Sequence, residues 1–214
     1  MEKQGMKFYA KDSNAVAIHA LPGHFATSHS HINYYIDITS LKTRVGEARD
    51  VAKVLAGKFT SHLTVDTIVC MDGTEVIGGF LAEEMENRNI MSTVNQHKTV
   101  YVVSPEFNSN NQMIFRDNIK PAIAGKHVLL LLATTTTGVT IRRSLECVRY
   151  YGGTAVGVAS VFSTVSQVEE FPVESVFDGE DIPGYAAYQT GECPYCQKGQ
   201  KLEAMVNGVG YSKL

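Results

Sequence analysis

The middle of the chain alternates short apolar runs with longer stretches whose apolar residues recur at helical spacing. The apolar runs are strand-sized, and the strongest of them contains the letters VLLLL. Runs that are apolar at every position are typical of parallel strands buried on both faces. The predicted strands are Val65–Met71, Thr99–Val103, Lys126–Ala133 and Thr154–Phe162.

Three stretches between and before these runs predict amphipathic helices, because their apolar residues fall on one helical face. They are Arg44–Phe59, Glu75–Arg88 and Val139–Tyr151. Gly152 and Gly153 end the last of them, since glycine is a favoured residue just beyond a helix C-terminus. Strands separated by single helices pair in parallel through crossover connections. The pattern therefore predicts an α/β fold with a doubly wound, mainly parallel sheet.

The two ends of the chain differ in amino-acid composition from the middle. His24–Ser40 is rich in His, Ser and Tyr, and Phe171–Leu214 is rich in Gly, Pro and Tyr. We expect both ends to fold together as a small hood over the core sheet. The predicted division is a hood segment over residues 1–40, a core over 41–170, and a second hood segment over 171–214. Within the core, the polar stretch Glu106–Asn118 predicts a long mobile loop.

Composition excludes several classes of protein. The chain has 214 residues, 44% of them hydrophobic and 19% charged, which suits one folded domain and argues against disorder. A net charge of −3 without a basic stripe gives no support for nucleic-acid binding. No apolar run reaches the roughly 18–20 residues that span a bilayer. Residues 1–12 lack the apolar core of a signal peptide, so we expect a cytoplasmic protein without membrane contact.

The segment after the VLLLL strand predicts an anion-binding turn. It places four threonines, a glycine and a further threonine between a buried strand and a helix. Ligands of parallel sheets bind at the carboxyl ends of the strands, where backbone N–H groups and the helix dipole favour a phosphate. We call residues 134–140 the threonine turn. Its candidate phosphate-binding residues are Thr134, Thr135, Thr136, Thr137, Gly138 and Thr140. A threonine-capped helix without a ligand is the alternative.

The stretch GKHVLLLLATTTTGVT (Gly125–Thr140), followed by a helix and YYGG, resembles the signature of type I phosphoribosyltransferases. Within that family the chain is most similar to orotate phosphoribosyltransferase-like proteins. SHSHINYYID (Ser28–Asp37) and VDTIVCMDGTEVIGGFLAEE (Val65–Glu84) resemble further segments of these proteins in the same order. Pro183–Glu203 resembles the Cys-rich ending of some members.

This resemblance implies binding of phosphoribosyl pyrophosphate or a nucleoside monophosphate, with Mg²⁺, and transfer of the phosphoribosyl group to a nitrogenous base. It implies a homodimer and a place in pyrimidine nucleotide metabolism. The threonine turn would hold the 5-phosphate, and Met113–Asp117 would form a mobile hood over the site. Asp72, Gly73 and Thr74 would lie at the pyrophosphate.

The chain departs from the family pattern in two places. The acidic pair of the signature, which would hold the ribose hydroxyls, is replaced by Leu132 and Ala133. Basic residues are missing from the strand before the loop, where only Lys98, Arg116 and Lys120 lie nearby. Two hypotheses follow. The protein is an enzyme with an altered substrate, in which Asp72, Glu75 or Asp117 replaces the lost acids. Alternatively, it is a regulator that binds a nucleotide or sugar phosphate without turnover.

Cys193 and Cys196 have the spacing of half a zinc site. Structural zinc needs four ligands, and no second Cys-x-x-Cys pair occurs in the chain. Histidines or a second subunit would have to complete a Zn²⁺ site. The same spacing also fits a redox dithiol, or two reduced cysteines in a tight turn.

His24, His29 and His31 lie within eight residues of one another. His29 and His31 share a face if this stretch is extended, which would suit a metal or substrate role. Histidines at the surface are the alternative. Tyr34 and Tyr35, just beyond, are candidates for stacking on a base or for packing in the core.

Overall fold

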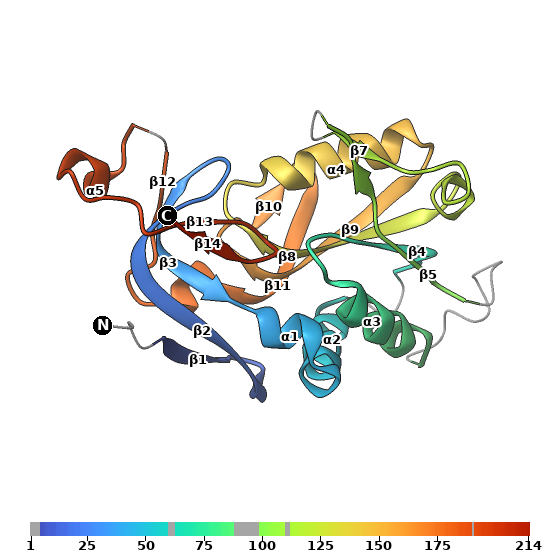
Figure 1. Cartoon of the computed structure of the whole chain (residues 1–214). Coiled ribbons are helices and arrows are strands. Elements are labelled where there is room, and N and C mark those ends of the chain that lie inside the picture. Colours follow the sequence, from blue (N-terminus) through green and yellow to red (C-terminus); the bar gives the residue numbers. More distant parts are fainter. Residues whose placement is uncertain (1–4, 60–62, 88–98, 110–111, 190) are drawn as a thin grey trace.

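The structure is a computed structural model that describes residues 5–59, 63–87, 99–109, 112–189 and 191–214. The described elements form a core around one parallel sheet and a hood in which strands from both ends of the chain pair with each other (Figure 1). Among the described helices, none combines the length and apolar character needed to cross a membrane.

The core sheet has the strand order β10-β11-β9-β8-β4-β5. Neighbouring strands run parallel, except that β10 pairs antiparallel with β11 at one edge. The strands are β4 (Thr67–Cys70), β5 (Tyr101–Val103), β8 (His127–Thr135), β9 (Thr154–Ser163), β10 (Gln167–Val168) and β11 (Phe171–Asp178). The prediction of a mainly parallel α/β sheet is therefore confirmed.

Helices cover both faces of the core sheet, which explains why its strands are apolar at every position. Leu129 and Leu131 of β8 pack in the cluster that includes α2 and α3, whereas Leu130 and Leu132 pack with α4 on the opposite face. All four leucines are completely buried. The helices are α1 (Thr39–Thr43), α2 (Val45–Lys58), α3 (Glu75–Asn87) and α4 (Val139–Tyr150), with 3₁₀ turns at Lys120–Ala122 and Gly179–Asp181.

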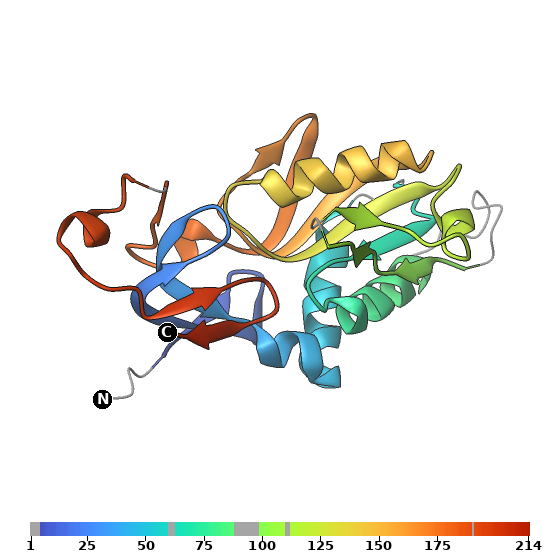
Figure 2. The same cartoon turned by 45° about the horizontal axis from the view of Figure 1, so that its top comes forward.

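The hood is a second sheet with the order β12-β3-β2-β13-β14, and β1 pairs with β2 beside it. Figures 1 and 2 show its N-terminal strands, in blue, beside the C-terminal strands, in red. The elements are β1 (Met6–Ala10), β2 (Ser13–Ala26), β3 (His31–Asp37), β12 (Ala187–Tyr188), α5 (Pro194–Gln197), β13 (Ala204–Val206) and β14 (Tyr211–Lys213). The expectation that both ends contribute to one hood is confirmed.

Two segments differ from their predicted structure. Phe171–Asp178 forms β11 and pairs with β9, so this part of the C-terminal segment lies in the core sheet rather than in the hood. The predicted long loop over Glu106–Asn118 contains a small antiparallel hairpin of β6 (Glu106–Phe107) and β7 (Met113–Ile114). Its residues 110 and 111 lie outside the described residues, as do Arg88 and Lys98.

Candidate functional site

The threonine turn lies where β8 ends and α4 begins. The sequence predicts that the strand stops at Ala133, but β8 continues through Thr134 and Thr135. Threonine is β-branched and suits a strand, so these two residues extend the apolar run instead of leaving it. After β9, Thr164 fixes the turn from outside: its N–H donates to the Thr135 carbonyl (3.0 Å) and its hydroxyl to the Thr136 carbonyl (2.8 Å).

Gly138 sets the path of the chain into α4. Its φ of 72° lies in the left-handed region, and a Cβ at this position would stand 2.8 Å from Cγ2 of Val168. Glycine is therefore required by backbone conformation and by packing against Val168, rather than by the approach of a ligand. Among the described residues, no side chain caps α4 at this end. The N–H groups of its first turn are left for solvent or a ligand, together with the positive end of the helix dipole.

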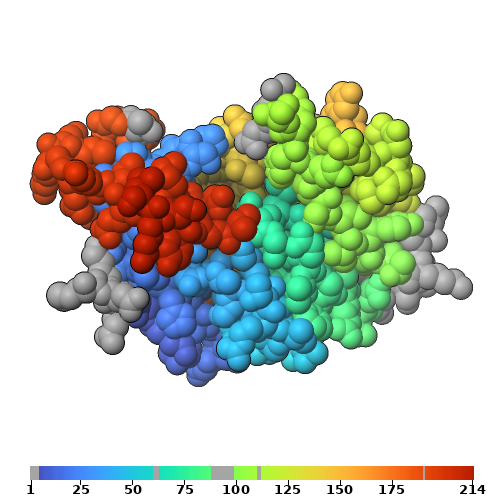
Figure 3. All heavy atoms as spheres, viewed as in Figure 1, coloured from blue at the N-terminus to red at the C-terminus, as the bar shows by residue number. Residues whose placement is uncertain are grey.

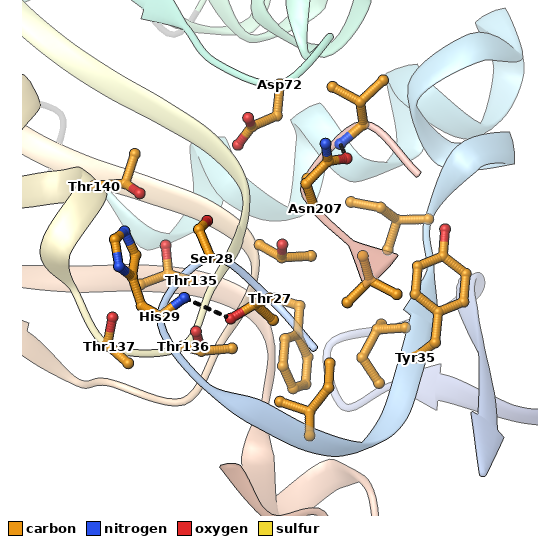
Figure 4. Close-up of a pocket in the computed structure, with 18 of the residues that line it drawn as sticks. Thr27, Ser28, His29, Tyr35, Asp72, Thr135, Thr136, Thr137, Thr140 and Asn207 are labelled. Carbon is orange, nitrogen blue, oxygen red and sulfur yellow. Dashed lines mark hydrogen bonds between the residues drawn. The ribbon is translucent and has the colours of Figure 1, made fainter. Parts of the chain in front are cut away.

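A cavity of about 150 Å³ separates the threonine turn from the hood. All residues of the threonine turn line one side of it. The hood contributes Thr27, Ser28, His29, Ile32, Tyr35, Ile36, Tyr185, Val206, Asn207, Gly208 and Val209, and the core adds Ile38, Thr39, Lys42, Asp72 and Phe162. Figure 4 shows Ser28 and His29 beside Thr135, Thr137 and Thr140, with Asp72, Asn207 and Tyr35 along the other sides. One end of the cavity is thus polar, and the other is aromatic and aliphatic.

Two buried hydroxyl groups at this cavity have no hydrogen-bond partner among the described residues. They are Oγ1 of Thr135 and the phenol oxygen of Tyr185. Buried polar groups are almost always paired, because an unpaired one costs about 1–3 kcal/mol. Thr135 and Tyr185, the residues that carry these hydroxyls, both belong to the cavity wall.

The loop after β4 brings Asp72 to the opposite wall. Asp72 and Gly73 both have positive φ, 57° and 80°, which turns the chain sharply at the end of the strand. Of the three residues expected at a pyrophosphate, only Asp72 lines the cavity. Thr74 is completely buried, and its hydroxyl donates to the carbonyl oxygens of Met71 (2.9 Å) and Leu131 (3.2 Å). Thr74 therefore holds the loop in place.

Lys42 of α1 supplies a buried positive charge beside Asp72. Its ammonium group donates to the carbonyl oxygens of Asp72 (2.8 Å) and Gly208 (2.6 Å). Burial lowers the pKa of Lys42, and the Asp72 and Glu75 carboxylates oppose that shift. Burial also raises the pKa of Asp72, against the attraction of Lys42. Sequence reasoning did not predict the burial of Lys42, because a lysine beside Leu41 in a short helix is ordinarily solvent-exposed.

The C-terminal hairpin, β13 and β14 with their turn at residues 207–210, lies against the same loop. A Cβ at Gly208 would overlap the side chain of Asp72. Figure 3 shows the tip of the red C-terminal segment meeting the residues that follow β4. This hairpin covers Asp72 at the expected pyrophosphate position.

Leu132 and Ala133, which replace the acidic pair, are completely buried in β8. Leu132 packs with α4, and Ala133 packs in the cluster on the other face of the sheet. Mg²⁺ takes oxygen ligands, and Asp72 provides the only carboxylate lining the cavity among the described residues. The side chains present do not fit the magnesium site implied by the resemblance.

Glu75 and Asp117, the other residues proposed to replace the acidic pair, lie away from the cavity. Glu75 accepts a hydrogen bond from the hydroxyl of Ser104 (2.6 Å) and does not line the cavity. Asp117 is almost fully exposed and pairs with Lys120 at 2.6 Å. Of the three candidates, the structure brings only Asp72 to the cavity.

The segment expected to cover the site packs instead against α4. Phe115 is buried in the cluster around α4, and the thiol of Cys147 lies 3.4 Å from the Met113 carbonyl oxygen. Arg116 is held by Glu106 through two hydrogen bonds of 2.9 and 2.8 Å. No described residue of 99–117 lines the cavity, so Met113–Asp117 lies away from it in this conformation, and its role as a mobile hood stays a prediction.

The three histidines that are close in sequence lie in two different places in the fold. His29 lies in the turn between β2 and β3 and lines the cavity. His29 and His31 therefore do not share a strand face, because only His31 is in a strand. His24 and His31 lie together with Cys193 and Cys196, away from the threonine turn. Tyr35 lines the cavity, with its ring 5.0 Å from that of Tyr211.

No protein-family model matches the sequence, and no curated protein matches it. Solved structures do match. The orotate phosphoribosyltransferase of Aeropyrum pernix has a TM-score of 0.52 at 16% identity, over 75% of this chain and 88% of that one. UMP synthase of Leishmania donovani gives 0.51 at 18% identity, over 70% of this chain but only 31% of that one.

The orotate phosphoribosyltransferase of Mycobacterium tuberculosis H37Rv, solved in complex with inorganic phosphate, gives 0.50 at 15% identity. That match covers 70% of this chain and 80% of the other. Likeness at such identities reports the fold and leaves the reaction open. The chain has the fold of the type I phosphoribosyltransferases.

Proposed function

We propose that the protein binds the 5-phosphate of a phosphorylated ribose at the threonine turn and transfers the phosphoribosyl group to a nitrogenous base. Its phosphorylated ligand is phosphoribosyl pyrophosphate or a nucleoside monophosphate. The observation that carries this proposal is the buried, unpaired hydroxyl of Thr135 beside the uncapped N-terminus of α4. Hydroxyl and backbone N–H donors at a helix N-terminus suit a phosphate dianion.

The reaction replaces one bond at the anomeric carbon. The bond from that carbon to the pyrophosphate oxygen breaks, and its electron pair leaves with pyrophosphate. A ring nitrogen of the base forms the new bond with inversion, and its proton passes to solvent. Tyr35, Phe162 and Ile36 offer the base an apolar wall within reach of the cavity's polar end. The hood over the cavity limits the access of water to the reacting carbon.

Binding without turnover is a second candidate, and specific observations favour it. Leu132 and Ala133 give the ribose hydroxyls no acceptor, and both are committed to the hydrophobic core. The C-terminal hairpin covers Asp72, which leaves little room for a pyrophosphate there. In this case the same pocket would sense a nucleoside monophosphate or ribose 5-phosphate.

One set of measurements separates these functions. The full chain is titrated calorimetrically with ribose 5-phosphate, phosphoribosyl pyrophosphate and nucleoside monophosphates, and pyrophosphate release is followed with a panel of bases. Release with one base supports transfer, and binding without release supports the sensor. Failure of every phosphorylated ligand to bind rejects both.

The resemblance also implies a homodimer, and we propose that the chain pairs in solution. Light scattering after size-exclusion chromatography measures the molar mass directly. A mass of a single chain at micromolar concentration would reject the dimer without affecting the proposed ligand.

A further inference from the structure

Two histidines from the N-terminal half of the hood lie beside two cysteines from its C-terminal half. His24 is near the end of β2, and His31 begins β3. Cys193 precedes α5, and Cys196 lies within it. One ligand atom from each residue lies within 4.8 Å of the other three. The two histidines are more than 160 positions from the two cysteines in the chain, so only the pairing of both ends in one sheet brings them together.

Four of the six distances among these atoms are close to those of a tetrahedral metal site. Nε2 of His24 is 3.2 Å from Nδ1 of His31, 3.4 Å from Sγ of Cys193 and 3.6 Å from Sγ of Cys196. Sγ of Cys196 is 3.3 Å from Nδ1 of His31. Zinc bonds of about 2.0–2.1 Å to nitrogen and about 2.3 Å to sulfur place tetrahedral ligands about 3.3–3.8 Å apart.

A second contact orients the buried histidine for a metal. Nδ1 of His24 lies 3.0 Å from the carbonyl oxygen of Gln200. A carbonyl oxygen only accepts hydrogen bonds, so Nδ1 carries the proton and Nε2 presents its lone pair to the cluster. A backbone carbonyl that fixes a histidine tautomer in this way is the usual outer partner of a zinc ligand.

The segment around α5 buries little of its own surface, although β12 at its start pairs with β3 and Tyr195 stacks on His24. Among described residues 187–189 and 191–200, Cys193 is the only buried one, and α5 itself spans only Pro194–Gln197. A short segment without apolar burial cannot offset its own ordering entropy. Metal ligation would supply further stabilisation and would join α5 to β2 and β3.

We infer that His24, His31, Cys193 and Cys196 bind one structural zinc ion. Two thiolates and two imidazoles form a closed set of four protein ligands, which suits structural Zn²⁺ and leaves no open position for catalysis. The ion fastens the C-terminal part of the hood to the turn at residues 27–30, whose Thr27, Ser28 and His29 line the cavity. The site stands on its own geometry and does not depend on the proposed function.

The metal content of the full chain tests this directly. Purified protein, prepared without added chelator, should contain about one zinc ion per chain by elemental mass spectrometry. The double variant Cys193→Ser/Cys196→Ser should lose it. Cys147→Ser is the matched control, since Cys147 is a half-buried thiol on α4 and should leave zinc content unchanged.

A second measurement covers the case in which the double variant does not fold. Wild-type protein stripped of metal under reducing conditions is titrated with Co²⁺, and the thiolate-to-cobalt absorption of a tetrahedral site is followed. One equivalent should saturate the signal, and Zn²⁺ should displace it and raise Tm. Absence of zinc together with absence of the cobalt spectrum overturns the inference, as does a Cys193–Cys196 disulfide in the protein as isolated.

Discussion

The backbone of Gly208 lies against the carboxylate of Asp72, so closely that any side chain at position 208 would overlap it. Lys42 joins the two residues by donating hydrogen bonds to both of their carbonyl oxygens. The tip of the C-terminal hairpin is therefore fixed to the loop after β4, and the hood is closed over the cavity at this side.

Gly208→Ala should displace the hairpin tip from Asp72. Overpacking of this kind costs about 1–3 kcal/mol of unfolding free energy. Gly210→Ala is the matched control, because a Cβ there meets no atom within 4 Å, and it should change stability by no more than about 0.5 kcal/mol. Denaturant unfolding monitored by circular dichroism compares the two variants. Equal stability of both would show that the contact at Gly208 is absent in solution.

Lys42→Met keeps the length of the side chain but leaves the carbonyls of Asp72 and Gly208 without their donor. Unpaired buried acceptors cost about 1–3 kcal/mol, so the variant should unfold at clearly lower denaturant concentration. Lys53→Met, on the exposed face of α2, serves as the control and should have nearly wild-type stability. A Lys42→Met protein as stable as the control would contradict the bridging role of Lys42.

Asp72 should make stability depend on pH. Burial raises the pKa of its carboxyl, so the folded state binds this proton more tightly than the unfolded state. The resulting stability is present below the ordinary Asp pKa of about 3.9 and is lost as the pH rises through the folded pKa. Asp72→Asn should remove that decline, and asparagine tolerates the positive φ.

The unfolding free energies of wild type and Asp72→Asn are measured from acidic to neutral pH. Glu146→Gln, on the exposed side of α4, is the control. The control should keep the wild-type pH profile. An Asp72→Asn protein whose profile also matches wild type would mean that Asp72 is not buried by the hairpin.

Thr135→Val should separate ligand binding from folding. The change removes a hydroxyl that has no protein partner, so stability should be unchanged or slightly higher. Affinity for ribose 5-phosphate should fall about tenfold, which corresponds to about 1.4 kcal/mol for a lost hydrogen bond to a charged group.

Thr67→Val is the matched comparison, because the Thr67 hydroxyl donates to the Ala122 carbonyl within the core. It should lower stability by about 1–3 kcal/mol, because it leaves that carbonyl unpaired, and should leave affinity unchanged. Calorimetric titration and thermal unfolding of both proteins test the pair. A loss of stability in Thr135→Val without a loss of affinity would show that the Thr135 hydroxyl serves folding and not phosphate binding.

Restoring one acid at Leu132 should unfold the protein rather than raise its transfer activity. Leu132→Asp places a carboxylate in a fully buried position against α4, at a cost of several kcal/mol. Leu132→Met conserves volume and should cost less than about 1.5 kcal/mol. Expression, circular dichroism and pyrophosphate release assess both. A folded Leu132→Asp protein with more transfer activity than wild type would show that this strand end can still serve a catalytic role.

The sequence predicted the core well because buried parallel strands and amphipathic helices have strong local patterns. The β8 and α4 boundaries were predicted within two residues, and the extension of β8 followed from the β-branched threonines. The hairpin of β6 and β7 was missed, since strands of two residues carry no periodic signal.

Contacts between the ends of the chain could not be predicted locally. The burial of Lys42 depends on Gly208, which lies 166 positions later. The sequence suggested both a histidine cluster and half a zinc site, but only the pairing of β2 with β3 and β13 brings His24 near Cys193. Register between distant strands decides such sites, and no single segment encodes it.

The central claim is that the threonine turn binds a phosphate group, and a crystal structure of the protein with ribose 5-phosphate tests it most directly. We expect the phosphate oxygens to accept hydrogen bonds from the first N–H groups of α4 and from the Thr135 hydroxyl. The sugar should extend toward Tyr35. A structure in which the ligand is bound elsewhere, or in which the turn stays without phosphate at saturating ligand, would contradict the account.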